Sequence, residues 1–471
     1  MCGLKSGEHG VKNLLKTRCP RAFRRYDSLQ AARDGVLPDG APQNMSRRAR
    51  TAVLVDGNVC LHGVPESVGT MEAFTAIVYG YVRDALRAGS LVVVVLDEPE
   101  HMTFAKREEQ NRRDAQRRAR EITCSDDMAA VGLQEDFTRE QLDALDDVFV
   151  LCANRRCRQR LFDEVMLRVF DRARKVIDQW DVAEHGTTSL LIDGLDARGC
   201  ERGVGEARLP AMVGNDDAVR AAFARTAPIG EGDMKLQDVE TRLRRLVSTP
   251  HSGYERYCLC ITSTVDTDTF MAGTIDVAKR RVAPFEGALH ALFCMREPAT
   301  KRDREFDADA RATFLACDVA LLEGMLQEHV WSRSTPTPTA QQMLHAILAF
   351  ASASALCGCD FTSHTGQKGS RADHFWDALP DFVAQEPHAL ARFGCALAAD
   401  VEVAQGATDG LQRFCVCASE KMRAKPRYAR QADAVADTSD TMLLRSCWAA
   451  AYWAANEFEA LPSWGFLPHF A

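Results

Sequence analysis

Two apolar segments separated by one helical segment constrain the fold of this chain more than any other feature. The segments Ala52–Val55 and Leu91–Leu96 are rich in Val and Leu, and each stops at an acid, Asp56 and Asp97. Between them, Thr70–Ala88 carries apolar residues at helical spacing. This stretch therefore predicts one β-α-β unit of a parallel sheet, with both acids at the carboxyl edge of the sheet.

A third acid-terminated strand and two further helices extend this pattern along the chain. Tyr257–Val265 alternates weakly between apolar and polar residues and runs into two acids, Asp266 and Asp268. Apolar residues at helical spacing predict helices over 308–330 and 339–357. Strands that alternate with helices predict an α/β protein with a central, mostly parallel sheet flanked by helices.

The composition is that of a globular chain. It argues against a nucleic-acid coat protein, a zinc-binding protein and a membrane protein. A net charge of −8 over 471 residues argues against a protein that simply coats nucleic acid, although basic clusters such as Lys106–Arg120 allow local attraction to DNA. The 17 cysteines have no C-x-x-C spacing, which favours reduced, buried thiols over zinc ligation. No apolar secretory segment opens the chain, and the apolar run from Met343 is short for a membrane span, so no membrane partner is expected.

Seven carboxylates stand out by their position, and most of them also have a plain structural explanation. They are Asp56, Asp97, Glu231, Asp233, Asp266, Asp268 and Asp360. An acid after a strand commonly caps the next helix, and acids in a first helical turn, such as Glu231 and Asp233, interact favourably with the helix dipole. Asp266 and Asp268 place like charges close together unless a cation intervenes. Asp360 follows an uncharged run of small residues, where a buried acid needs a partner.

A set of carboxylates of this size suits hard divalent cations. Mg²⁺ and Mn²⁺ prefer oxygen ligands, and a phosphodiester-cleaving site uses several carboxylates to hold two ions. One ion would activate the attacking water, and the other would stabilise the leaving oxygen. The pattern therefore indicates a site for two Mg²⁺ or Mn²⁺ ions, in which all seven acids are candidate ligands and catalytic residues.

The order of these segments resembles the flap endonuclease family of structure-specific DNA nucleases. The motifs that carry the likeness are Gly10-Val-Lys-Asn-Leu-Leu, Val55-Asp56-Gly-Asn, Val95-Leu96-Asp97-Glu-Pro, Glu231-Gly-Asp233, Thr264-Val-Asp266-Thr-Asp268-Thr-Phe and Cys357-Gly-Cys-Asp360-Phe. Each is short, and only their shared order over about residues 10–380 is specific. The resemblance implies a PIN-like sheet, a helical arch and a helix-hairpin-helix-type element. It also implies endonuclease and 5′-3′ exonuclease action on flaps, gaps or junctions of branched or gapped double-stranded DNA, in replication, recombination and repair.

The same resemblance divides the chain into two parts. It implies a nuclease domain over residues 1–385, whereas the Ala-rich, helical pattern of residues 386–471 predicts a helical C-terminal region. Within the first part, 98–180 would form the arch and a helical insertion, and 340–385 would form the helix-hairpin-helix-type region.

Two sets of residues would contact DNA if the resemblance holds. Lys106 and Arg107 resemble the arch Lys-Arg pair, so Arg107 is a candidate for stabilising charge in the transition state. Gly366, Lys368 and Gly369 lie in a segment that resembles the glycine hairpin whose backbone N–H groups bind a duplex phosphate, often with a K⁺ ion. A charged helix usually faces solvent, and two glycines three apart are common in turns, so both assignments also have a structural alternative.

The length, the diverged arch and the long insertion before Glu231 resemble the poxviral branch of the family. That likeness implies a viral enzyme in the host cytoplasm, in viral factories with replication and recombination proteins as possible partners. The chain departs from the family pattern in three places: nine residues precede Gly10, Glu98–Ala105 contains no Lys or Arg, and no sliding-clamp binding box is visible. Clamp recruitment is therefore not expected.

Two other functions stay open from the sequence. Asp266-Thr-Asp268-Thr faintly resembles the nucleophile and acid pair of haloacid-dehalogenase-like phosphatases, but that pair should open the core domain. A catalytically weak DNA-junction-binding recombination scaffold would keep the fold, although all seven acids are in place here. The segment Leu191-Ile-Asp193-Gly imitates the first metal motif, but it lies in a Gly-rich stretch without the matching helix, so we interpret it as structural.

Overall fold

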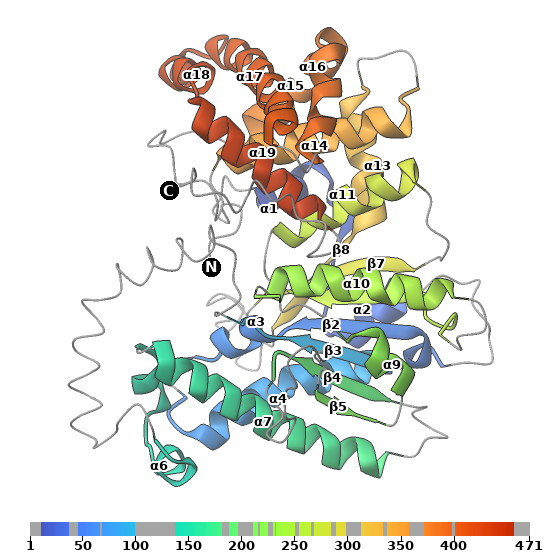
Figure 1. Cartoon of the computed structure of the whole chain (residues 1–471), viewed down its shortest axis with the longest axis vertical. Helices are drawn as coiled ribbons and strands as arrows, with labels where there is room; N and C mark the ends of the chain where they lie inside the picture. The colour runs from blue at the N-terminus through green and yellow to red at the C-terminus, as the bar shows by residue number, and fades with distance from the viewer. Residues whose placement is uncertain are drawn as a thin grey trace.

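The structure is a computed structural model that combines a mixed sheet, covered by helices on both faces, with a region built of helices alone (Figure 1). It describes residues 11–36, 46–65, 68–98, 137–153, 155–180, 188–195, 211–214, 217–224, 229–230, 232–249, 254–264, 268–283, 289–297, 312–332, 337–357, 372–397 and 401–455.

The sheet has eight strands within these residues. In the order in which they lie side by side, they are β1 (Phe23–Tyr26), β8 (Thr313–Asp318), β7 (His290–Glu297), β6 (Leu259–Ser263), β2 (Thr51–Asp56), β3 (Leu91–Val95), β4 (Ser189–Asp193) and β5 (Ala211–Val213).

The α-helices of the described residues are α1 (Val11–Arg18), α2 (Leu29–Val36), α3 (Gly57–His62), α4 (Met71–Ala88), α6 (Arg139–Asp143), α7 (Arg155–Gln179), α9 (Asp217–Ala222), α10 (Gly232–Ser248), α11 (Asp268–Val282), α13 (Val319–Val330), α14 (Ala340–Leu356), α15 (Ala372–Gln385), α16 (Pro387–Ala391), α17 (Val401–Arg423), α18 (Ala429–Ala436) and α19 (Asp440–Ala454). Short 3-10 helices are η1 (Pro20–Ala22), η2 (Arg48–Arg50), η4 (Val148–Ala153), η5 (Arg392–Leu397) and η6 (Pro426–Tyr428).

The centre of the sheet is parallel and its edges are antiparallel. Parallel pairings join β7, β6, β2, β3 and β4 in one run. Antiparallel pairings attach β8 and β1 at one edge and β5 at the other. The predicted α/β fold with a mostly parallel sheet flanked by helices is confirmed, and the carboxyl ends of β6, β2 and β3 are neighbours at one edge.

Successive residues of β2 pack against opposite faces of the sheet. Val53 and Val55 belong to a buried cluster that includes residues of α2, α3, α4 and α7. Ala52 and Leu54 belong to a second cluster that includes residues of α9 and α10. Because side chains alternate along a strand, this central strand is buried along its whole length and apolar over residues 52–55, as expected when both faces are covered.

The β-α-β unit forms as the sequence predicts. The Thr70 side chain caps α4 by accepting a hydrogen bond from the Ala73 N–H (3.3 Å), and the Gly89 N–H closes the helix on the Ala85 carbonyl. A Cβ at Gly89 would lie 2.6 Å from the Thr51 carbonyl oxygen. The tight return from α4 to the sheet therefore requires glycine at this position.

The helical region shares one hydrophobic core. Buried residues of α11, α13, α14, α15, α17, α18 and α19 form a single cluster, which also contains Leu315 and Cys317 of β8. Every side chain of α14 from Ala346 to Leu356 is buried, and most are Ala or Ser, which let neighbouring helices approach closely. The cysteines of the described residues are free thiols, most of them buried. None of the described helices is long and apolar enough to cross a membrane.

One predicted helix is partly wrong. The range 308–330 was expected to be helical, but Thr313–Asp318 is strand β8, and helix α13 begins only at Val319. The run Thr-Phe-Leu-Ala-Cys is short and apolar, so its periodicity does not separate a buried strand from a helix segment. Its closing acid, Asp318, accepts a hydrogen bond from the Leu321 N–H and caps α13.

Candidate metal site at the carboxyl edge of the sheet

Asp56 ends the central strand β2 and caps the helix that follows. Its Oδ1 accepts hydrogen bonds from the backbone N–H groups of Asn58 (3.0 Å) and Val59 (3.2 Å), and the residue is buried. The structural role that the sequence allowed for this acid is therefore present, because the N-terminus of α3 stabilises its charge.

Asp97 lies two residues beyond the end of the neighbouring strand β3. Its Oδ1 accepts a hydrogen bond of 2.7 Å from the backbone N–H of Gly232, which is the first residue of α10. The carboxylate thus faces the positive end of a 17-residue helix. Both acids are consequently held near helix N-termini.

Gly232 brings these two carboxylates together. A Cβ added to Gly232 would lie 3.2 Å from Asp97 Oδ1, 3.3 Å from Asn58 Nδ2 and 3.8 Å from Asp56 Oδ1. Two acids that are 41 positions apart in the chain therefore converge on one backbone point. That point is the central residue of the predicted Glu231-Gly-Asp233 motif. Asp233 lies in the first turn of α10, but its side chain is outside the described residues.

Asp268 lies beyond a third neighbouring strand. It is the first residue of α11, it is buried, and it follows β6, which pairs directly with β2. Parallel strands with neighbouring carboxyl ends deliver their following residues to one edge of a sheet. Asp56, Asp97 and Asp268 thus lie at the carboxyl ends of three adjacent strands. The distances to Gly232 bring Asp56 and Asp97 together.

The remaining predicted site residues cannot be placed in this way. Outside the described residues lie Glu231, Asp266, Asp360, Lys106, Arg107, Gly366, Lys368 and Gly369. Among the described side chains, no group of three or more His, Cys, Asp or Glu residues is arranged to hold a metal ion. Asp56 and Asp97 supply two hard oxygen donors of the kind that Mg²⁺ and Mn²⁺ prefer, so this part of the predicted ligand set fits such an ion.

Asp193 was set aside as structural from the sequence, yet it lies at the same edge of the sheet. It is the last residue of β4, which pairs in parallel with β3, and its carbonyl oxygen accepts a hydrogen bond of 3.0 Å from the Leu96 N–H. The sequence signal was available, because Ser189–Ile192 is a short apolar run that stops at an acid, as in β2 and β3.

Lys235 and Glu98 also lie at this edge and had no signal in the sequence. The Lys235 ammonium is 2.7 Å from Glu98 Oε1, and the lysine is completely buried. Lysine is almost never fully buried in folded proteins, so a lysine in the first turn of a helix is expected to face solvent.

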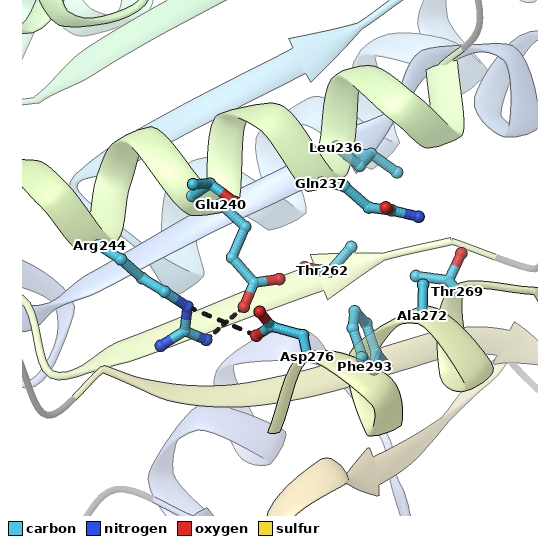
Figure 2. A pocket seen from close by; sticks show the side chains of 11 residues that line it. Leu236, Gln237, Glu240, Arg244, Thr262, Thr269, Ala272, Asp276 and Phe293 are labelled. Carbon is cyan, nitrogen blue, oxygen red and sulfur yellow. Dashed lines mark hydrogen bonds and ion pairs between the residues drawn. The ribbon is translucent and has the colours of Figure 1, made fainter. Parts of the chain in front are cut away.

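A small pocket, lined by both apolar and charged side chains, lies between α10 and α11, over β6 and β7 (Figure 2). Its volume of about 20 Å³ is room for a single water. Arg244 points into it and forms an ion pair with Glu240, and Arg244 Nε lies 4.0 Å from Asp276. Burial alone would lower the pKa of Arg244, but Glu240 and Asp276 hold it above its ordinary value. Arg244 and Glu240 lie on α10 and Asp276 lies on α11, so the attraction between Arg244 and Asp276 connects the two helices.

The structure describes most residues of four basic clusters, at 47–50, 155–160, 279–281 and 421–430. Most of their described side chains bond to other parts of the chain. Examples are Arg48 with the Leu86 carbonyl, Lys279 with the Ala454 carbonyl, Arg281 with Glu323, Lys421 with Asp381 and Arg423 with Asp433. These side chains join different elements of the fold, so they are less available to bind DNA phosphates.

No protein-family model matches the sequence, and no curated protein matches it.

Proposed function

We propose that this protein is a divalent-metal-dependent, structure-specific DNA nuclease of the flap-endonuclease type. The observation that carries the proposal is the convergence of Asp56 and Asp97 on Gly232, between Glu231 and Asp233. Three motifs far apart in the sequence are thereby brought to the carboxyl edge of a mostly parallel sheet. This supports the order of motifs on which the resemblance to the family depends.

The proposed ligand set for two Mg²⁺ or Mn²⁺ ions combines these acids with the others in the same order. It comprises Asp56, Asp97, Glu231, Asp233, Asp266, Asp268 and Asp360. Bound ions would supply electrostatic stabilisation of the phosphate and activation of water. The chain itself would hold Asp56 and Asp97 in place through backbone N–H groups at the starts of α3 and α10.

The proposed DNA contacts involve the arch and the glycine hairpin. Lys106 and Arg107 would face the scissile phosphate, and the backbone around Gly366, Lys368 and Gly369 would bind a duplex phosphate, with K⁺ where the hairpin resembles that of the family. Contacts of this kind read structure and charge without reading bases, so affinity should fall steeply with salt. A strongly sequence-dependent cut pattern on matched flaps would argue against the proposal.

The experiment is cleavage of a panel of flap, gap, nick and junction DNAs with Mn²⁺ or Mg²⁺. We expect Asp56→Asn and Asp266→Asn to lose more than about 100-fold in cleavage, because loss of a metal ligand should exceed the usual effect of an outer-shell partner. Asp409→Asn, an exposed acid that pairs with Arg392 on the surface, is the control and should cleave like wild type. Equal cleavage by all four proteins would remove the proposed site.

The same panel distinguishes a second function. A DNA-junction-binding recombination scaffold would bind the branched DNAs with the same affinity in wild type and Asp56→Asn, and neither would cleave. The resemblance to the poxviral branch would place either activity in viral replication or recombination in the host cytoplasm.

A further inference from the structure

Lys235 is the most deeply buried charged residue at the carboxyl edge among those described. Its exposed fraction is 0%, and its Nζ donates hydrogen bonds of 2.7 Å to Glu98 Oε1 and to the Leu96 carbonyl oxygen. A buried ammonium is unfavourable unless charged and polar partners surround it. The two bonds give Lys235 partners on both sides of Asp97 in the sequence.

The backbone immediately after β4 leaves room for the Lys235 side chain. Gly194 follows β4 with φ = 88°, a left-handed conformation that favours glycine. A Cβ at Gly194 would lie 2.9 Å from Lys235 Nζ and 3.1 Å from the Leu96 carbonyl oxygen. The position of the ammonium thus depends on a glycine from a third element of the site.

Lys235 is one of three links between the end of β3 and the start of α10. The Glu98 N–H donates to the Gly230 carbonyl (2.7 Å), and the Gly232 N–H donates to Asp97 Oδ1 (2.7 Å). Lys235 closes the set by bonding the residues immediately before and after Asp97. With its backbone held on both flanks, the Asp97 carboxylate has little freedom to move relative to Asp56.

We infer that Lys235 is a positioning residue for the metal site: its ammonium holds the Leu96 carbonyl and the Glu98 carboxylate, on either side of Asp97 in the sequence, and so sets the geometry in which Asp97 binds a divalent cation. This inference rests on the proposed function. It assigns no contact between Lys235 and the metal or the DNA.

Lys421 provides a matched control. It lies on α17, and its ammonium bonds the Asp377 carbonyl oxygen at 2.7 Å and the Asp381 carboxylate. Lys421 thus has the same two kinds of partner as Lys235, in another part of the chain. The variants Lys235→Met and Lys421→Met remove the same charge and keep a similar apolar length.

The test is Mn²⁺ binding to the full chain without DNA, measured by isothermal titration calorimetry and by the Mn²⁺-induced shift of the melting temperature. We expect Lys235→Met to bind Mn²⁺ about 10–100-fold more weakly than wild type, the range found when an outer-shell partner is removed. Lys421→Met should bind as wild type does. If Lys235→Met is less stable but binds Mn²⁺ with wild-type affinity, the residue is merely structural and the inference is wrong.

A second variant keeps the test decisive if Lys235→Met does not fold. Gly194→Ala removes no charge and no oxygen, but its Cβ would displace the ammonium, so it should weaken Mn²⁺ binding in the same direction. Unchanged Mn²⁺ affinity in this variant would overturn the inference and leave the proposed function standing. If wild type itself binds no Mn²⁺, the metal site and the role of Lys235 are both wrong.

Discussion

Replacement of Gly232 should separate the function of the site from the stability of the fold. Gly232 is the first residue of α10, and its φ is not in the left-handed region, so alanine fits the backbone there. Its Cβ would lie 3.2 Å from Asp97 Oδ1 and 3.3 Å from Asn58 Nδ2. These groups must move by a few tenths of an ångström in Gly232→Ala. The hydrogen bond between the Gly232 N–H and Asp97 then becomes longer or bent.

The expected size of the effect follows from two opposing contributions. Alanine favours a helix over glycine by up to about 1 kcal/mol, and a hydrogen bond to a charged group contributes about 1.5–3 kcal/mol when fully formed. A partly weakened bond offsets the helix gain, so the free energy of unfolding should change by less than about 1 kcal/mol. A misplacement of about 1 Å costs about 100-fold in rate, so a shift of a few tenths of that should cost about 3- to 10-fold.

Two assays on the same preparations measure these quantities. Urea denaturation gives the free energy of unfolding, and flap cleavage as a function of Mn²⁺ concentration gives the rate and the half-saturating concentration. Gly80→Ala is the control, since a Cβ at this α4 position would meet nothing within 4 Å. It should stabilise the protein by about 0.5–1 kcal/mol with no change in cleavage. If Gly232→Ala cleaves like Gly80→Ala at every Mn²⁺ concentration, then Asp97 is not a ligand held by Gly232.

Two further predictions concern buried charges in α10 and α13. Burial raises the pKa of Glu323, which the facing Arg281 at 2.6 Å opposes, so this carboxyl binds its proton more tightly in the folded than in the unfolded state. Wild type should therefore lose stability as pH rises from the unfolded value of about 4.3 through the raised folded value, and Glu323→Gln should be more stabilising at pH 8 than at pH 4.5 in urea denaturation. Arg244→Met should cost about 3–5 kcal/mol because Glu240 loses its buried partner, and the double variant with Glu240→Met should recover much of that loss; an additive double variant would refute the pairing.

The central strands were predictable because their pattern comes directly from burial. β2 and β3 are buried at every position, their apolar runs lead to Asp56 and Asp97, and the helix between them has its stop signal in Gly89. The edge strand β1, Phe23–Tyr26, has no such pattern. Its two arginines are exposed and its aromatic residues are only half-buried, so nothing in four residues distinguishes it from a loop.

The convergence of Asp56 and Asp97 was predictable at a coarser level than their partners. Strand order follows from β-α-β connectivity, and it places both acids at one edge. The approach of Gly232 to both acids depends on how α10 packs against β2, over more than a hundred intervening residues. Periodicity carries no information about such a contact, and for the same reason the sequence gives no sign that Lys235 is buried.

Asp56 and Asp97 were given two explanations from the sequence, as helix caps and as metal ligands, and the two are compatible. Asp56 and Asp97 each accept backbone N–H bonds at the start of a helix, which would stabilise them without any metal. Capping alone, however, does not explain why the two carboxylates should converge on a glycine, or why Lys235 should be buried beside them. Carboxylates packed near one another are unfavourable unless positive charge compensates them, and here the N-termini of α3 and α10 face Asp56 and Asp97, while the Lys235 ammonium pairs with Glu98. In the proposed nuclease, a divalent cation would therefore meet two carboxylates that backbone hydrogen bonds already hold in place.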